Sequence, residues 1–182
     1  QTQSETSTNS MFFYVCIHEI FHVMGVSSSC FPYYHPRNSN IPHENIYCSL
    51  YDEATGKNHT FLVTPHAHEF AVQHWGSDRF TSGSEWCPAG IEIEDGGGSG
   101  TAGSHPECRI GHSDLMVGVT IQGEVGPFQR FSPLTMAILL DTGFYDIDYR
   151  KIQPLLWGNK ETIDGNHINN FVMGPPDNVF PQ

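Results

Sequence analysis

The segment MFFYVCIHEIFHVMG, residues 11–25, contains the pattern H-E-x-x-H from His18 to His22. Positions four apart lie on the same face of an α-helix, so His18 and His22 can bind one metal ion. Glu19 can reach a water on that metal without being a ligand itself. Apolar residues on every side of this segment predict a buried helix, which Asn9 or Ser10 would cap and Gly25 would end.

The same pattern also occurs by chance in solvated helices. Here, however, the flanking residues are apolar, and unpaired polar groups in an apolar setting are costly. A bound zinc ion would satisfy the two imidazoles, and this favours a metal site over an incidental match.

A catalytic zinc site usually has three protein ligands and one open position. The short pattern H-E-x-x-H-x-x-G-x-x-H would supply the third histidine at position 28, but Ser28 stands there, although Gly25 matches the glycine. Among the eleven histidines, His105 is distinctive because it ends a glycine-rich run over 96–104. Such a run is typical of a flexible linker, but it also lets the backbone approach another group closely. The alternation of residues 91–94 predicts a strand just before it.

Met116 follows eleven residues after His105. A methionine in a turn beneath the metal is a second feature of the zinc peptidases called metzincins. Four blocks of sequence carry a resemblance to a known family. They are, in order, 18–25, 64–65 with 71–76, 90–105 running on to 114–116, and 134–145 followed by 157–158. On these blocks, which span roughly residues 11 to 158, the chain resembles the leishmanolysin family of zinc metallopeptidases, which includes the invadolysins.

This resemblance implies zinc as cofactor, with His18, His22 and His105 as ligands, Glu19 as the catalytic base and Met116 in the Met-turn. It implies an α+β fold with a metzincin-like zinc peptidase core, made of an active-site helix and a C-terminal subdomain. The N-terminal sheet subdomain of such enzymes is expected to be missing from this chain, so that the chain is a catalytic-core fragment. The implied activity is that of a secreted or cell-surface metalloendopeptidase that cleaves proteins or peptides.

Four regions are predicted: an active-site helix segment at 1–26, an insertion between the second and third ligands at 27–89, a C-terminal catalytic subdomain at 90–158, and a loose tail at 159–182. Residues 27–60 suggest an irregular segment. Helices are expected at 65–76, starting after Thr64-Pro65, and at 133–142, where Pro133 suits the first turn and Gly143 ends the helix.

The net charge of −12 argues against a nucleic-acid partner, which would require lysine and arginine to neutralise phosphates. No uncharged apolar stretch is long enough to predict a membrane span. Of the five cysteines, Cys30 with Cys48 and Cys87 with Cys108 are plausible pairs by proximity in the sequence, but the sequence does not fix the pairing. The sequence carries no signal for the oligomeric state.

Two alternatives remain open. Glu44 lies near the spacing at which gluzincins carry a carboxylate as third ligand, although its surroundings suggest a loop. Alternatively, the chain is a catalytically incomplete zinc-binding fragment that acts as a surface adhesion or binding module. Three departures from the resemblance concern the disulfides and the oxyanion: Ser77 replaces a cysteine, no cysteine follows Cys108, and Gly118 stands where some metzincins carry a tyrosine.

Overall fold

The structure is a computed structural model that describes residues 3–53, 55–98, 101–119, 122–123, 126–127, 129–159 and 171–174. Its helices and strands, in chain order, are α1 (Gln3–Val23), η1 (Phe31–Tyr33), β1 (Tyr47–Asp52), β2 (Lys57–Leu62), α2 (Pro65–Trp75), β3 (Arg79–Ser82), β4 (Glu85–Pro88), β5 (Ile91–Ile93), α3 (Cys108–Gly111), β6 (Gln122–Gly123), β7 (Gly126–Pro127), α4 (Pro133–Asp141), η2 (Tyr149–Lys151) and η3 (Phe171–Met173).

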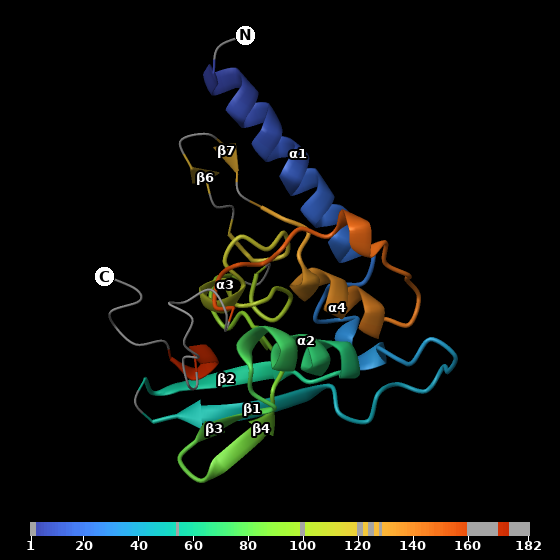
Figure 1. Ribbon diagram of the computed structural model, residues 1–182, viewed down its shortest axis with the longest axis vertical. Coiled ribbons are helices and arrows are strands. Elements are labelled where there is room, and N and C mark those ends of the chain that lie inside the picture. Colours follow the sequence, from blue (N-terminus) through green and yellow to red (C-terminus); the bar gives the residue numbers. More distant parts are fainter. Residues whose placement is uncertain are drawn as a thin grey trace.

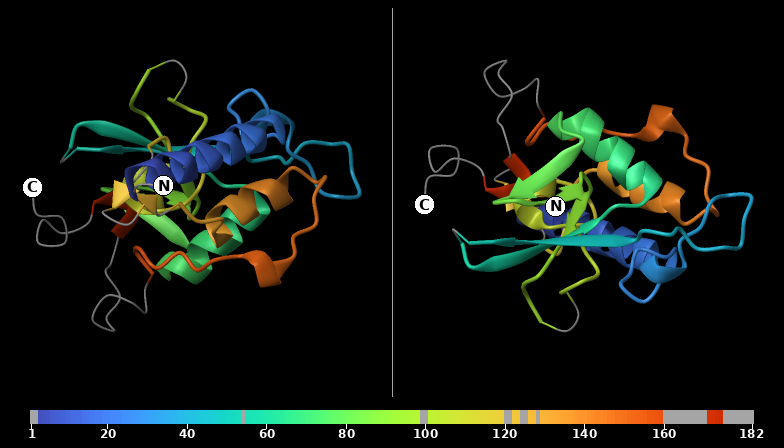
Figure 2. Two further views of the ribbon diagram at one scale, coloured as in Figure 1. Left: turned by 90° about the horizontal axis from the view of Figure 1, so that it is seen from above. Right: turned by 90° about the horizontal axis from the view of Figure 1, so that it is seen from below.

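Helices and short antiparallel sheets together form one α+β fold, as predicted. Strands β1, β2 and β5 form a three-stranded sheet in the order β1-β2-β5, and β3 pairs with β4. Figure 1 shows α1 at one end of the molecule and the sheet at the other, with α2 and α4 between them. The views along the long axis in Figure 2 show that α2 and α4 lie beside each other on one side of α1. The expectation of an irregular segment at 27–60 is wrong, because β1 and the first four residues of β2 lie within it.

The predicted first helix is present, but it begins earlier than expected. It extends from Gln3 to Val23, so Asn9 and Ser10 lie inside the helix and neither caps it. Gly25 follows the helix with a φ of 116°, a backbone conformation that residues other than glycine rarely adopt. This glycine turns the chain back, and its carbonyl accepts a hydrogen bond from the Tyr34 hydroxyl.

The prediction that this helix is buried on all sides is wrong. One face carries Phe12, Phe13, Ile20 and Val23, whose exposed fractions are 69, 60, 55 and 89%. The opposite face contributes partly buried residues to the core, namely Tyr14, Ile17, Phe21 and Met24. Helix α1 is therefore held against the rest of the described structure along one side only.

Both other predicted helices are confirmed, and a buried aspartate joins them. Helix α2 ends at Gly76 in the left-handed conformation, and α4 is capped by Ser132. Asp141, the last residue of α4, accepts hydrogen bonds from the Thr64 hydroxyl and from the backbone N–H groups of His66 and Ala67. The carboxylate thus satisfies the free donors at the start of α2 and fixes the two helices against each other.

The disulfide joins Cys48 on β1 to Cys87 on β4. The suggested pairs are therefore wrong, because Cys30 and Cys108 are both free thiols. Sequence proximity failed here because packing between two separate sheets brings β1 and the β3–β4 hairpin together, so that cysteines 39 positions apart can pair.

We expect the double substitution Cys48→Ala with Cys87→Ala to lower the free energy of unfolding by about 4 kcal/mol, because the bond closes a loop of about forty residues in the unfolded chain. Urea titration of both forms measures the change. Cys16→Ala, at an exposed thiol on α1, is the control and should change the free energy by less than about 0.5 kcal/mol. A double variant as stable as this control would contradict the prediction.

Part of the tail is packed rather than loose. Phe171, Val172 and Met173 form η3 and are buried in the core, whereas 160–170 and 175–182 lie outside the described residues. Across the described ranges, no helix is both long and apolar enough to cross a bilayer.

Candidate metal centre

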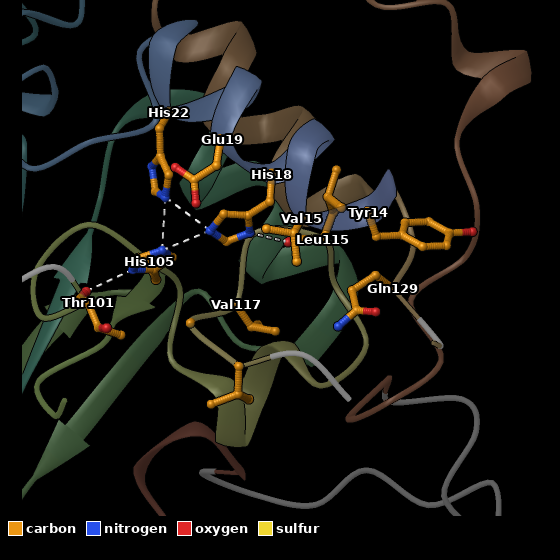
Figure 3. Close-up of a pocket in the computed structure, with 12 residues that line it drawn as sticks. Tyr14, Val15, His18, Glu19, His22, Thr101, His105, Leu115, Val117 and Gln129 are labelled. Atoms are coloured by element: carbon orange, nitrogen blue, oxygen red, sulfur yellow. Dashed lines mark hydrogen bonds between the residues drawn. The ribbon is translucent and has the colours of Figure 1, made fainter. Parts of the chain in front are cut away.

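Three imidazoles predicted from the sequence meet at one point. The Nε2 atoms of His18 and His22 are 3.0 Å apart, and His105 Nε2 lies 3.0 Å from the first and 2.9 Å from the second. The helix places the first two one turn apart, while His105 approaches from the loop between β5 and α3. Figure 3 shows the three rings pointing toward each other.

The other nitrogen of each ring, Nδ1, is hydrogen-bonded to a backbone carbonyl. The Nδ1 atoms of His18, His22 and His105 lie 2.8, 2.6 and 2.8 Å from the carbonyl oxygens of Leu115, Val26 and Thr101, respectively. A carbonyl can only accept, so each Nδ1 carries the proton. In the neutral rings, none of the three Nε2 atoms then carries a proton, so all three are hydrogen-bond acceptors and none can donate to another.

Three converging lone pairs repel each other unless a cation lies between them. A tetrahedral zinc ion with Zn–N bonds of about 2.0–2.1 Å would separate its nitrogen ligands by roughly 3.3 Å. The observed spacing of 2.9–3.0 Å needs only a small expansion to reach this value. The donor set and its carbonyl partners therefore fit a zinc ion with an open fourth position.

Burial favours the neutral form of two of these rings. It lowers the pKa of His18 against the opposing effect of the hydrogen bond to Leu115, and the nearby His22 lowers that pKa further. Burial likewise lowers the pKa of His105, where the hydrogen bond to Thr101 opposes it. Neutral imidazole is the form that binds metals, so the surroundings favour metal binding at neutral pH.

Glu19 lies beside the imidazoles at the edge of a cavity of ≈ 280 Å³. Its side chain is exposed, and its carboxylate points into the space next to His22 and His18 (Figure 3). Within the part of the chain that the structure describes, Glu19 belongs to no group of possible metal ligands. A carboxylate in this place could accept a proton from a water in the cavity, and the role of base predicted for Glu19 stays a prediction.

The turn that carries Met116 forms the floor of the site. Leu115 supplies the carbonyl for His18, and Met116 is completely buried. Asp114 holds this turn: its carboxylate accepts hydrogen bonds from the backbone N–H of Met116 and from the hydroxyls of Ser132 and Thr135. The turn is thereby fixed to the start of α4.

Gly118 is required where the loop passes His105. A Cβ atom at this position would lie 2.5 Å from Thr101 Cγ2 and 3.6 Å from His105 Cγ. Any larger residue would push on the segment whose carbonyl orients His105. The glycine noted as a departure from other metzincins thus has a packing role here.

Several contributors could not be found from the sequence. The carbonyls of Leu115, Val26 and Thr101 have no side-chain signature, because every residue carries a carbonyl. For Ser132 and Thr135, the partners of Asp114, the only signal in the sequence was their place beside Pro133 at the start of a predicted helix. Glu44, the alternative third ligand, is exposed in the loop before β1 and does not line this cavity.

Comparison with known proteins gives a consistent result. A family model described as leishmanolysin matches residues 2–173. A leishmanolysin-like peptidase of Drosophila pseudoobscura pseudoobscura is 28% identical over 87% of the chain, and one of Drosophila melanogaster is 42% identical over 47%. Leishmanolysin of Leishmania major is 29% identical over 79% of the chain. The matched regions are only 27, 14 and 20% of these three relatives, respectively.

Proposed function

Because the chain belongs to the leishmanolysin family of metallopeptidases, we propose that it is a zinc-dependent endopeptidase, with His18, His22 and His105 as ligands and Glu19 as general base. The convergence of three Nε2 atoms carries this proposal. Each of these imidazoles has its Nδ1 proton committed to a backbone carbonyl, so together they offer three lone pairs to one cation.

Zinc bound there would supply Lewis acidity, which brings the pKa of water to about 7 and polarises a carbonyl. The chain's own residues orient the reaction. Glu19, at the edge of the cavity, accepts the proton of the attacking water and passes it to the leaving amine. The carbonyls of Leu115, Val26 and Thr101 keep the ligand rings fixed while this happens.

Extended peptides are the substrates that this site fits. Tyr14 and Val15 of α1 line the cavity, together with Val117 and Val119 from the segment after Met116. An apolar wall beside the ligands suits the side chain of a residue next to the cleaved bond. We propose a secreted or cell-surface location, which the Cys48–Cys87 disulfide supports because such bonds persist in oxidising compartments.

The test uses the purified chain with an unfolded, fluorescently labelled protein as substrate. We expect 1,10-phenanthroline to reduce cleavage at least about 100-fold and added zinc to restore it, because general-base catalysis and Lewis acidity both require the metal-bound site. The non-chelating isomer 1,7-phenanthroline is the control. Cleavage that survives chelation would contradict a metallopeptidase, and stoichiometric zinc without cleavage would favour the alternative of a zinc-binding module.

A further inference from the structure

A buried charged cluster lies behind the loop that carries His105. Glu92, in the middle of β5, is 5% exposed. Its Oε1 accepts a hydrogen bond from His59 Nδ1 on β2 at 2.5 Å, and its Oε2 accepts one from Arg109 Nη2 on α3 at 2.5 Å. This one carboxylate thus links β5 to two other segments, β2 and α3.

The same residue also closes the base of the loop through its backbone. The Glu92 carbonyl accepts a hydrogen bond from the Glu107 N–H, and the Glu94 N–H donates to the carbonyl of His105 itself. The loop of 94–107 therefore leaves β5 and returns to α3 at a stem in which both the side chain and the backbone of Glu92 take part. His105 lies on the returning side of this stem.

The cluster is poorly explained as a source of stability alone. His59 Nε2 and Arg109 Nη1 are buried, and neither has a hydrogen-bond partner within the described structure. A buried ion pair often contributes little net stability, and buried polar atoms without a hydrogen-bond partner make its contribution smaller. Burial raises the pKa of Glu92, while the hydrogen bond from His59 and the charge of Arg109 lower it.

Arg109 connects the stem to further parts of the core. Its Nη2 also donates to the carbonyl of Val172, and its own carbonyl accepts a hydrogen bond from Trp157 Nε1. The three glycines at 96–98 have no side chains that could pack and define the loop. The hydrogen bonds of the stem therefore help to place His105, together with the bond from its Nδ1 to the Thr101 carbonyl.

We propose that Glu92 is a positioning residue: held between His59 and Arg109, it fixes the stem of the 94–107 loop and so sets His105 against His18 and His22. This inference rests on the proposed function for its importance to catalysis. The geometry of the stem itself does not depend on a metal, so it can be tested in the metal-free protein.

The first measurement is amide hydrogen exchange in the metal-free chain. In Glu92→Gln, we expect the amides of Glu94 and Glu107 to exchange at least about tenfold faster, because the stem opens locally. Leu50→Ala, at a buried position on β1, is the control for general destabilisation. Equal protection of these two amides in Glu92→Gln and in Leu50→Ala would overturn the proposal, whether or not the chain is a peptidase.

The second measurement is zinc affinity by competition with a chelator. Glu92→Gln should weaken binding about 10–100-fold, the range found when residues that orient a ligand are changed. Arg109→Met should act similarly, and Arg109→Lys should retain most of the affinity because it keeps the charge. Leu50→Ala should bind zinc like the original chain. Tight zinc binding by a folded Glu92→Gln would overturn the positioning role and leave the proposed function intact.

Should Glu92→Gln fail to fold, the double variant Glu92→Met with Arg109→Met removes both charges and leaves neither one unpaired. The proposal expects this variant to be folded, with fast exchange at the stem and weakened zinc binding. Native exchange rates and native zinc affinity in this variant would overturn it.

Discussion

Glu19→Gln is expected to keep a full equivalent of zinc while kcat for peptide cleavage falls about 10²–10⁴-fold, the usual contribution of a general base. The amide has nearly the same shape as the carboxylate but cannot accept a proton from water. Because the three imidazoles and their carbonyl partners are unchanged, metal binding should be unaffected. Zinc content by elemental analysis and initial cleavage rates measure the two quantities on the same sample.

Glu44→Gln is the matched control for that experiment. Glu44 is also an exposed glutamate, but it lies in the loop before β1 and outside the cavity. Its substitution should leave both zinc content and cleavage unchanged. Equal activity of Glu19→Gln and the original chain would contradict the assignment of Glu19, and loss of zinc from Glu44→Gln alone would revive the carboxylate alternative for the third ligand.

His105→Ala should weaken zinc binding by roughly 10²–10³-fold, because structural zinc sites with four protein ligands bind the metal with about 10–16 kcal/mol, or about 2.5–4 kcal/mol for each ligand. Cleavage should be lost at zinc concentrations that saturate the original chain. The stabilisation that zinc gives against thermal unfolding should also disappear at these concentrations, because it depends on the ratio of free zinc to its dissociation constant.

His112→Ala is the control for His105→Ala. His112 is exposed, lies seven positions later and belongs to no possible metal group within the described ranges. It should bind zinc normally. If both variants bind zinc equally well, the cation is not held by the histidine cluster, and the function proposed from that cluster is wrong.

Local chemistry was predictable from the sequence. The spacing of His18 and His22 is a property of any helix, and the proline and glycine at the ends of α2 and α4 have the same effect in any fold. The choice of His105 came from the resemblance to a family rather than from its spacing, because a glycine-rich run could equally be a linker. The structure brings its ring to the other two, while its role as a ligand stays a prediction.

Features that depend on distant contacts were not predictable. Cys48 and Cys87 pair because β1 packs against the β3–β4 hairpin, and no sequence spacing reports that packing. The exposure of Phe12 and Val23 also escaped prediction, since an apolar face shows that something could pack there but not that the described residues do. The same limit applies to Asp141, whose capping role depends on where α4 meets α2.

The third imidazole comes from a residue 83 positions after the second. Strands β1, β2 and β5, helix α2 and the β3–β4 hairpin lie in between, so the three imidazoles stay together only while that whole region is folded. If these imidazoles hold zinc as proposed, metal occupancy and folding are thermodynamically linked, and a copy without the ion unfolds more often. If the chain cleaves unfolded polypeptides as proposed, copies without metal would become substrates of the metal-bound copies. Proteolysis of one copy by another would then remove the inactive fraction.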